Sequence, residues 1–163
     1  MPYHLQELRE EQLPAITGIY NHYVLNTTAT FHAQPLTAEK MKEIVFFANP
    51  KYKTWVIMQQ DALYGYVVLT QYKKREAYDE TAEVSVYLQP GCAGRGAGSL
   101  AVKHIEVFAR QAGIHVLIAT ICGENDKSIK LFEKNGYLKC AHFKEVGRKF
   151  GQLLDIVAYQ KII

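Results

Sequence analysis

The chain contains 163 residues, of which 48% are apolar, so it is long enough to bury the core of one compact domain and leaves no room for a second. Its net charge is +3, and the 19 Lys and Arg are dispersed along the sequence, which suits a small ligand that carries phosphate and does not require nucleic acid. The three cysteines, Cys92, Cys122 and Cys140, have neither CxxC nor Cys/His spacing, which argues against a disulfide framework and a metal site.

The N-terminal half reads as a strand, two helices and an antiparallel meander. Its first residues, MPYHLQELREEQL, carry acidic side chains and no long apolar run, so we expect neither a signal peptide nor a membrane partner, and a cytoplasmic location. Alternation and helical spacing of apolar residues predict a strand (3–8), a helix (13–24), a Thr-rich loop (26–35), a helix (37–48) and three strands (53–59, 63–71 and 82–88).

The C-terminal half begins at a cluster of glycines and continues as alternating helices and strands. The pattern predicts a helix (100–112), a strand (116–121), a helix (126–134) that ends at Asn135-Gly136, and two strands (138–147 and 153–161). The order of elements predicts an α+β fold: one domain over residues 1–163, with a central mixed, mostly antiparallel sheet flanked by helices.

The segment VSVYLQPGCAGRGAGSL is the most informative part of the sequence, because a strand enters a run of glycines and then a helix. Glycine lets successive backbone N–H groups converge on phosphate oxygens, and the N-terminus of the following helix adds further attraction. There is no GxxxxGK[ST] motif, and no acidic residue stands at the spacing of a dinucleotide-binding fold. A tight strand-to-helix connection without a ligand is the alternative.

AGRGAG resembles the acetyl-CoA motif of the GNAT N-acetyltransferases, Q/R-x-x-G-x-G/A, in which the turn binds the pyrophosphate. The resemblance implies that the pantetheine arm pairs with the backbone of Val86, Tyr87 and Leu88, extending the sheet. It implies a pyrophosphate site at Ala93, Gly94, Arg95, Gly96, Ala97, Gly98 and Ser99. The sequence departs from the motif at Ala93, where the family usually has Arg or Gln, and Arg95 is a possible substitute for the missing charge.

GENDKSIKLFEKNGY resembles the second cofactor segment of the same family. The resemblance assigns contacts with the pantetheine, or with a water bound to it, to Asn125 and Ser128; a helix N-cap is the alternative for Asn125. The family often places a Tyr or His in this helix to protonate the departing thiolate. Phe132 stands there and has no proton to give, so we expect it to serve packing.

Three further segments, IYNHYVLNTTATF, REAYDETAEVSVYL and HFKEVGRKFGQLLD, resemble the branch that acetylates phosphinothricin and methionine sulfoximine. The resemblance implies a homodimer and a small amino-acid-like acceptor. It also implies an acceptor site formed by Phe31, Arg75, Ala77 and Tyr78. Arg75 is suited to pair with a carboxylate, and a solvated loop position is its alternative.

Glu83 is the candidate general base. An amine must lose its proton before it attacks a thioester, and the resembling branch places an acid at this position of the strand. A surface carboxylate or an ion-pair partner is the alternative. We expect a backbone N–H near Leu88 to stabilise the oxyanion if the strand is bulged there.

Other functions remain open from the sequence. Within the enzymes, the alternative acceptors are a protein N-terminus, a lysine or a polyamine; outside them, the alternatives are a regulatory module that binds acyl-CoA without turnover and a structural interaction domain. His22 and His32 lack a second ligand at metal spacing, so we assign no metal.

Overall fold

The computed structural model describes residues 2–163 as a seven-stranded sheet flanked by four α-helices, which confirms the predicted α+β class. The strands lie in the order β1-β2-β3-β4-β5-β7-β6, and the β4–β5 pair is the parallel one. The elements are β1 (His4–Glu7), η1 (Glu10–Gln12), α1 (Leu13–Asn26), α2 (Ala38–Val45), β2 (Lys53–Gln59), β3 (Ala62–Gln71), η2 (Glu76–Tyr78), β4 (Thr81–Leu88), α3 (Ala97–Gln111), β5 (Val116–Cys122), α4 (Asp126–Lys134), β6 (Leu138–Lys149) and β7 (Gln152–Ile162).

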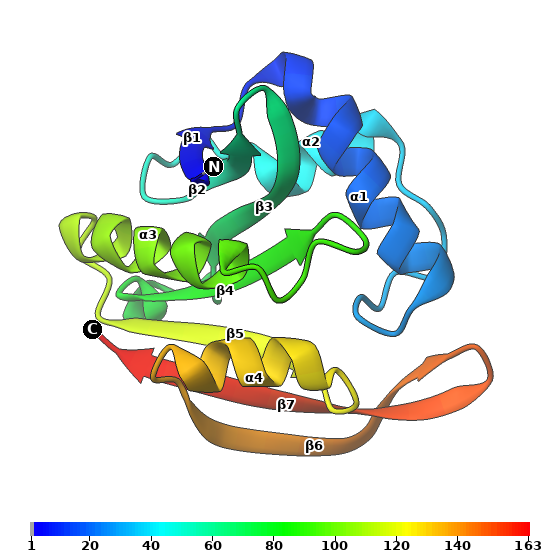
Figure 1. Cartoon of the computed structure of the whole chain (residues 1–163). Helices are drawn as coiled ribbons and strands as arrows, with labels where there is room; N and C mark the ends of the chain where they lie inside the picture. The colour runs from blue at the N-terminus through cyan, green and yellow to red at the C-terminus, as the bar shows by residue number, and fades with distance from the viewer. Residues whose placement is uncertain (1) are drawn as a thin grey trace.

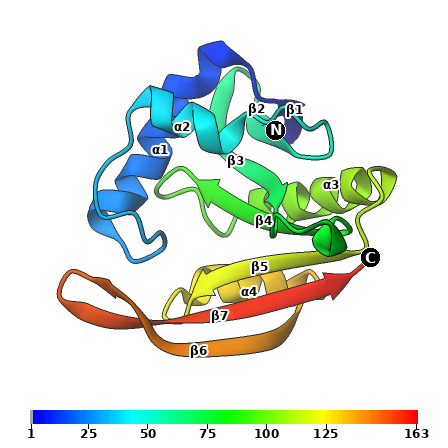
Figure 2. The same cartoon turned by 180° about the vertical axis from the view of Figure 1, so that it is seen from behind.

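Helices cover both faces of the sheet: α1 and α2 lie over β1 to β4 on one face, whereas α3 and α4 lie on the other (Figures 1 and 2). Two clusters of buried side chains result, and the strands supply both by their two-residue alternation. Val56 and Val68 face α1, whereas Ile57 and Leu69, their neighbours in the chain, face α3. Fully buried aliphatic positions on both sides of β2 and β3 explain why these strands read as nearly continuous apolar runs.

Where the structure differs from the predicted boundaries, packing gives the reason. The predicted helix over residues 37–48 ends at Val45, because Phe46 adopts an extended conformation. Phe47 then packs against both core clusters, with its ring 6.2 Å from that of Tyr52. At the start of the same helix, the Thr37 side chain accepts a hydrogen bond from the Lys40 N–H and forms the N-cap.

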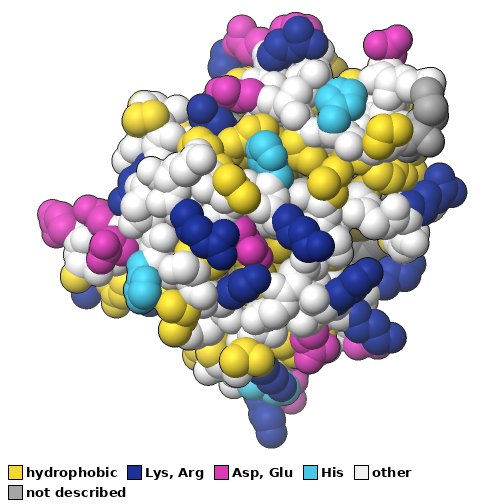
Figure 3. All heavy atoms as spheres, turned by 60° about the vertical axis from the view of Figure 1, so that its left-hand side comes forward, with side chains coloured by type: hydrophobic (Ala, Val, Ile, Leu, Met, Phe, Trp, Pro, Cys, Tyr) yellow, Lys and Arg dark blue, Asp and Glu magenta, His cyan; other side chains and the backbone are white. Residues whose placement is uncertain are grey.

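The surface is mixed in charge. On the side that lies to the left in Figure 1, Lys and Arg side chains are spread out with neutral atoms between them (Figure 3). None of the helices described in residues 2–163 combines the length and the hydrophobicity needed to cross a membrane.

Candidate functional site

The central sheet splits between β4 and β5. The two strands pair only at Thr81 with Val116, Ala82 with Leu117 and Glu83 with Ile118. β4 continues for five more residues, to Leu88, and β5 continues to Cys122 without further pairing between them, so they diverge (Figure 1). We call the unpaired part, residues 84–88 facing residues 119–122, the split. A split exposes backbone donors and acceptors in the middle of the sheet.

The backbone of β4 presents alternate residues to the split. Gln89 donates its N–H to Tyr64 O at 2.8 Å. In an antiparallel ladder the backbone N–H and C=O groups of Gln89 and Tyr87 therefore point toward β3, whereas those of Leu88 and Val86 point away from it. Tyr23 accordingly reaches Leu88 from the other side and donates its hydroxyl to the carbonyl oxygen at 2.5 Å. Of the three predicted pantetheine partners, the backbones of Val86 and Leu88 are directed into the split. The backbone of Tyr87 is not.

The bulge expected near Leu88 is absent. The ladder between β3 and β4 runs without a register shift from Gln71 paired with Ala82 to Gly65 paired with Leu88. The divergence of β4 from β5 frees the Leu88 N–H instead, so a donor for an oxyanion is available in a regular strand.

The glycine turn lies at the open end of the split and leads into α3. Gly91, Gly94 and Gly96 have φ angles of +84°, +80° and +85°, and an added Cβ would meet nothing within 4 Å at any of them. These positions therefore need glycine for conformation rather than for close packing. Gly96 is the N-cap of α3 and provides no side-chain cap, so the first N–H groups of the helix are available to an anion. Arg95 is exposed beside them.

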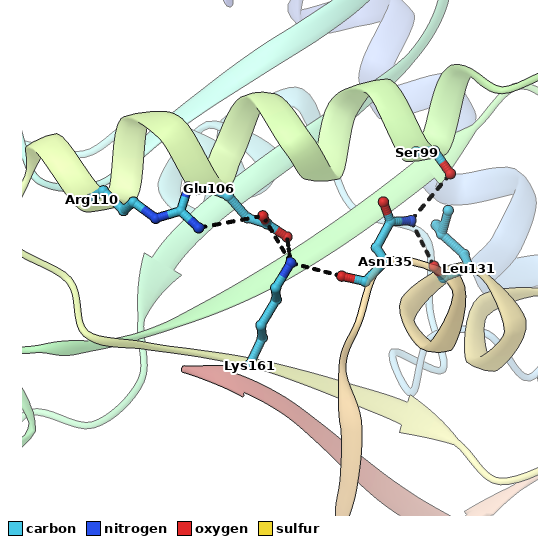
Figure 4. Close-up of polar contacts among 6 residues, drawn as sticks. All are labelled: Ser99, Glu106, Arg110, Leu131, Asn135 and Lys161. Carbon is cyan, nitrogen blue, oxygen red and sulfur yellow. Dashed lines mark hydrogen bonds and ion pairs between the residues drawn. The ribbon is translucent and has the colours of Figure 1, made fainter. Parts of the chain in front are cut away.

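Two residues predicted to contact the cofactor also hold α3 against α4. A Cβ on Gly98 would lie 3.1 Å from the Leu131 side chain, so the two helices pack closely at this glycine and a larger residue would require Leu131 to shift. Ser99 accepts a hydrogen bond of 3.1 Å from the Asn135 side chain, which also donates to Leu131 O (Figure 4). The first turn of α3 is thereby fixed in place.

Asn125 and Ser128 form the N-terminus of α4. Asn125 is the N-cap, and its side-chain oxygen accepts a hydrogen bond of 3.3 Å from the Ser128 N–H. The capping alternative is confirmed, and a contact with the cofactor stays a prediction for both residues. Phe132 is 2% exposed, with its ring 4.9 Å from that of Tyr137, which confirms its packing role.

Glu83 lies where β4 and β5 separate. It is half-buried, and none of the ion pairs found in residues 2–163 involves it. Burial raises the pKa of its carboxyl above the ordinary value, while a hydrogen bond with the Thr120 side chain partly offsets that rise. A raised pKa brings a carboxylate closer to the pH at which it exchanges protons with an amine.

Four tyrosines cluster on one face of the sheet, with Tyr87 of β4 in the middle. The sequence patterns did not predict this cluster. The Tyr87 ring lies 5.4 Å from Tyr20, 5.8 Å from Tyr23 and 5.3 Å from Tyr66. Burial raises the pKa of the Tyr87 hydroxyl, with the Glu83 charge contributing to the rise. Tyr20 and Tyr23 lie within the helix predicted over residues 13–24, and the available signal was that these positions are Tyr rather than aliphatic.

The predicted acceptor residues lie at opposite ends of the sheet within one chain. Phe31 follows α1 and packs on Gly147, near the C-terminal end of β5. Arg75, Ala77 and Tyr78 lie in the connection that precedes β4, at the closed end of the split. Arg75 and Ala77 are exposed, and the Tyr78 ring packs edge-on at 5.8 Å from Tyr72. Glu83 lies between the two groups along β4.

Comparisons with known proteins identify the family. The model of the acetyltransferase (GNAT) family matches residues 16–137. The chain is 32% identical to a phosphinothricin N-acetyltransferase of Streptomyces coelicolor, over 93% of this chain and 91% of the other. It is 31% identical to an L-methionine sulfoximine/L-methionine sulfone acetyltransferase of Salmonella typhimurium, over 90% and 86%.

A solved GNAT phosphinothricin acetyltransferase from Sinorhizobium meliloti, in complex with AcCoA, superposes with a TM-score of 0.92 at 28% identity, covering 100% of this chain and 89% of that one. The family match spans most of the chain, and the Sinorhizobium meliloti structure superposes on all of it. The chain therefore belongs to the acetyltransferase (GNAT) family and is an N-acetyltransferase.

Proposed function

We propose that the enzyme transfers the acetyl group of acetyl-CoA to the amino group of a small amino-acid-like acceptor of the phosphinothricin or methionine sulfoximine type. The observation that carries the proposal is the placement of one half-buried carboxylate, Glu83, where β4 and β5 part, with a glycine turn at the other end of the same strand. The named relatives supply the acceptor class.

The donor site in this proposal consists mainly of backbone groups. The N–H groups of the glycine turn and of the first turn of α3 are suited to the pyrophosphate. Backbone groups of Val86 and Leu88 are suited to the amides of the pantetheine arm, which then takes the place of a neighbouring strand. Because these contacts use the backbone, Ala93 in place of the family Arg or Gln removes one side-chain contact and leaves the others.

The chemical step then needs three functions. Glu83 accepts a proton from the acceptor ammonium, and the free amine attacks the acetyl carbonyl directly, so a C–N bond forms and the C–S bond breaks. The Leu88 N–H stabilises the oxyanion of the intermediate. The departing thiolate takes a proton from Tyr23, whose hydroxyl lies at Leu88, and the second proton lost by the acceptor nitrogen as the amide forms restores the tyrosine hydroxyl.

In this proposal the acceptor lies beside Glu83 with Phe31 on one side. Arg75, Ala77 and Tyr78 lie at the opposite end of the sheet within one chain, so we expect them to reach an acceptor only from the second subunit of a homodimer. The guanidinium of Arg75 is suited to the acceptor's carboxylate. We also expect the enzyme to be a homodimer, as the resemblance implies. Sedimentation equilibrium checks this expectation.

The test is a thiol-release assay with acetyl-CoA against methionine sulfoximine, phosphinothricin, common amino acids, a polyamine and a lysine peptide, with calorimetry of acetyl-CoA alone. We expect turnover of the first two acceptors. Turnover of the peptide or polyamine alone would replace the acceptor class, and binding of acetyl-CoA without any turnover would favour a regulatory module.

A further inference from the structure

A short segment after α1, residues 27–32, links the two halves of the split sheet; we call it the strap. It leaves the end of α1 and approaches the β6–β7 hairpin across the open end of the split, as both views of the ribbon show (Figures 1 and 2). Between β4 and β5 themselves, only the three pairs at the closed end join the halves.

On one side the strap is tied to α1. The Tyr20 hydroxyl shares hydrogen bonds with Thr30 Oγ1, at 2.6 Å, and with His32 Nδ1. Thr27 donates its hydroxyl to Tyr23 O at 2.8 Å. The strap is therefore held by the two tyrosines of α1 that border Tyr87.

On the other side the strap is tied to the C-terminal half. Lys149, the last residue of β6, donates from Nζ to both Thr27 O and Thr30 O at 2.7 Å. The Thr28 hydroxyl donates to Glu124 Oε1 at 2.5 Å, and a Cβ on Gly147 would overlap the Phe31 ring. Each contact joins residues that are far apart in the chain.

Lys149 is unusual because it is a lysine of which only 7% is exposed. A buried ammonium is expensive unless its protons have acceptors, and the two strap carbonyls are those acceptors. Loss of the ammonium would leave two carbonyls without their donor, and the strap would then lose its fixed position.

We propose that Lys149 is a positioning residue that holds the strap across the split and so fixes Phe31 against the acceptor. The inference deepens the proposed function and rests on it. It assigns Lys149 to the binding of the acceptor and not to the binding of acetyl-CoA, because the glycine turn and the first turn of α3 make no contact with Lys149 among the hydrogen bonds found in residues 2–163.

The test compares Lys149→Met with Lys144→Met, a matched control at an exposed lysine of the same strand. For Lys149→Met we expect KM for the acceptor to rise about tenfold or more, while Kd for acetyl-CoA changes by less than about twofold. Amide hydrogen exchange should accelerate in residues 27–32 and stay unchanged in residues 91–96. The control should match the wild type in all three measurements.

A second variant keeps the proposal testable if Lys149→Met does not fold. Gly147→Ala leaves Lys149 in place and displaces the Phe31 ring, so it should also raise KM for the acceptor and leave Kd for acetyl-CoA unchanged. In folded Lys149→Met, an unchanged KM for the acceptor overturns the role of Lys149. An equal loss of affinity for the acceptor and for acetyl-CoA also overturns it. A wild type that acetylates no amine refutes the proposed function instead, and unaltered exchange in the strap of Lys149→Met would still refute the positioning role.

Discussion

Replacing Gly96 by Val tests whether the glycine turn holds the pyrophosphate. Gly96 has a φ of +85°, and no atom lies within 4 Å of an added Cβ, so the substitution meets a conformational penalty without a clash. That penalty is about 1–2 kcal/mol, or somewhat more for a β-branched side chain. Since domains are stable by about 5–15 kcal/mol, we expect Gly96→Val to fold, with a Tm lower by a few degrees.

Gly96→Val should lower the affinity for acetyl-CoA far more than it lowers the stability of the fold. Relief of the strain turns the backbone at the N-cap of α3 and re-aims the N–H groups that face the phosphates. Each hydrogen bond to a charged group contributes about 1.5–3 kcal/mol. Loss of one or two should therefore raise the Kd for acetyl-CoA by about tenfold to a thousandfold or more. Isothermal calorimetry of acetyl-CoA measures the change directly.

Gly113→Val is the matched control for this experiment. Gly113 follows the other end of α3, with a φ of +84° and again nothing within 4 Å of an added Cβ. The same substitution therefore imposes a similar strain on the same helix, away from the turn. Equal losses of affinity in both variants, or unchanged affinity in Gly96→Val, would refute a pyrophosphate site at the turn.

Three further variants test the chemistry and the acceptor site. Glu83→Gln should lower kcat by about 10²–10⁴ with acetyl-CoA affinity nearly unchanged, and should abolish the rise in rate as pH increases through the raised pKa of this carboxyl; an unaltered pH-rate profile removes Glu83 from the role. The carboxyl of Glu83 has a higher pKa in the folded chain than in the unfolded chain. The folded protein therefore loses stability as the pH rises from the unfolded pKa through the folded pKa. At neutral pH, Glu83→Gln should therefore have a higher melting temperature than the wild type. Below the pKa of Glu83 in the unfolded chain, this difference should disappear. Tyr23→Phe should lower kcat and spare Kd for acetyl-CoA, whereas wild-type kcat would exclude it as the acid. Arg75→Ala should raise KM for an acceptor with a carboxylate and leave the KM for acetyl-CoA unchanged; steady-state kinetics with both substrates decides.

The sequence determined most of the local structure. Helical spacing, two-residue alternation and glycines define elements through interactions between near neighbours, so the order of strands and helices along the chain was predictable. Gly91, Gly94 and Gly96 were recognisable as a turn before α3 because positive φ restricts the choice of residue. Phe132 was recognisable as packing because its ring has no proton to give.

The tertiary structure decided what surrounds the reacting groups. Which strand lies beside which, and where β4 parts from β5 after Glu83, depends on pairing between distant segments and not on local pattern. The contact of Lys149 with Thr30 spans 119 residues of sequence, and burial together with this contact distinguishes Lys149 from its exposed neighbours. Side-chain type and spacing do not encode burial across such separations, because burial is settled only when both halves of the sheet have packed.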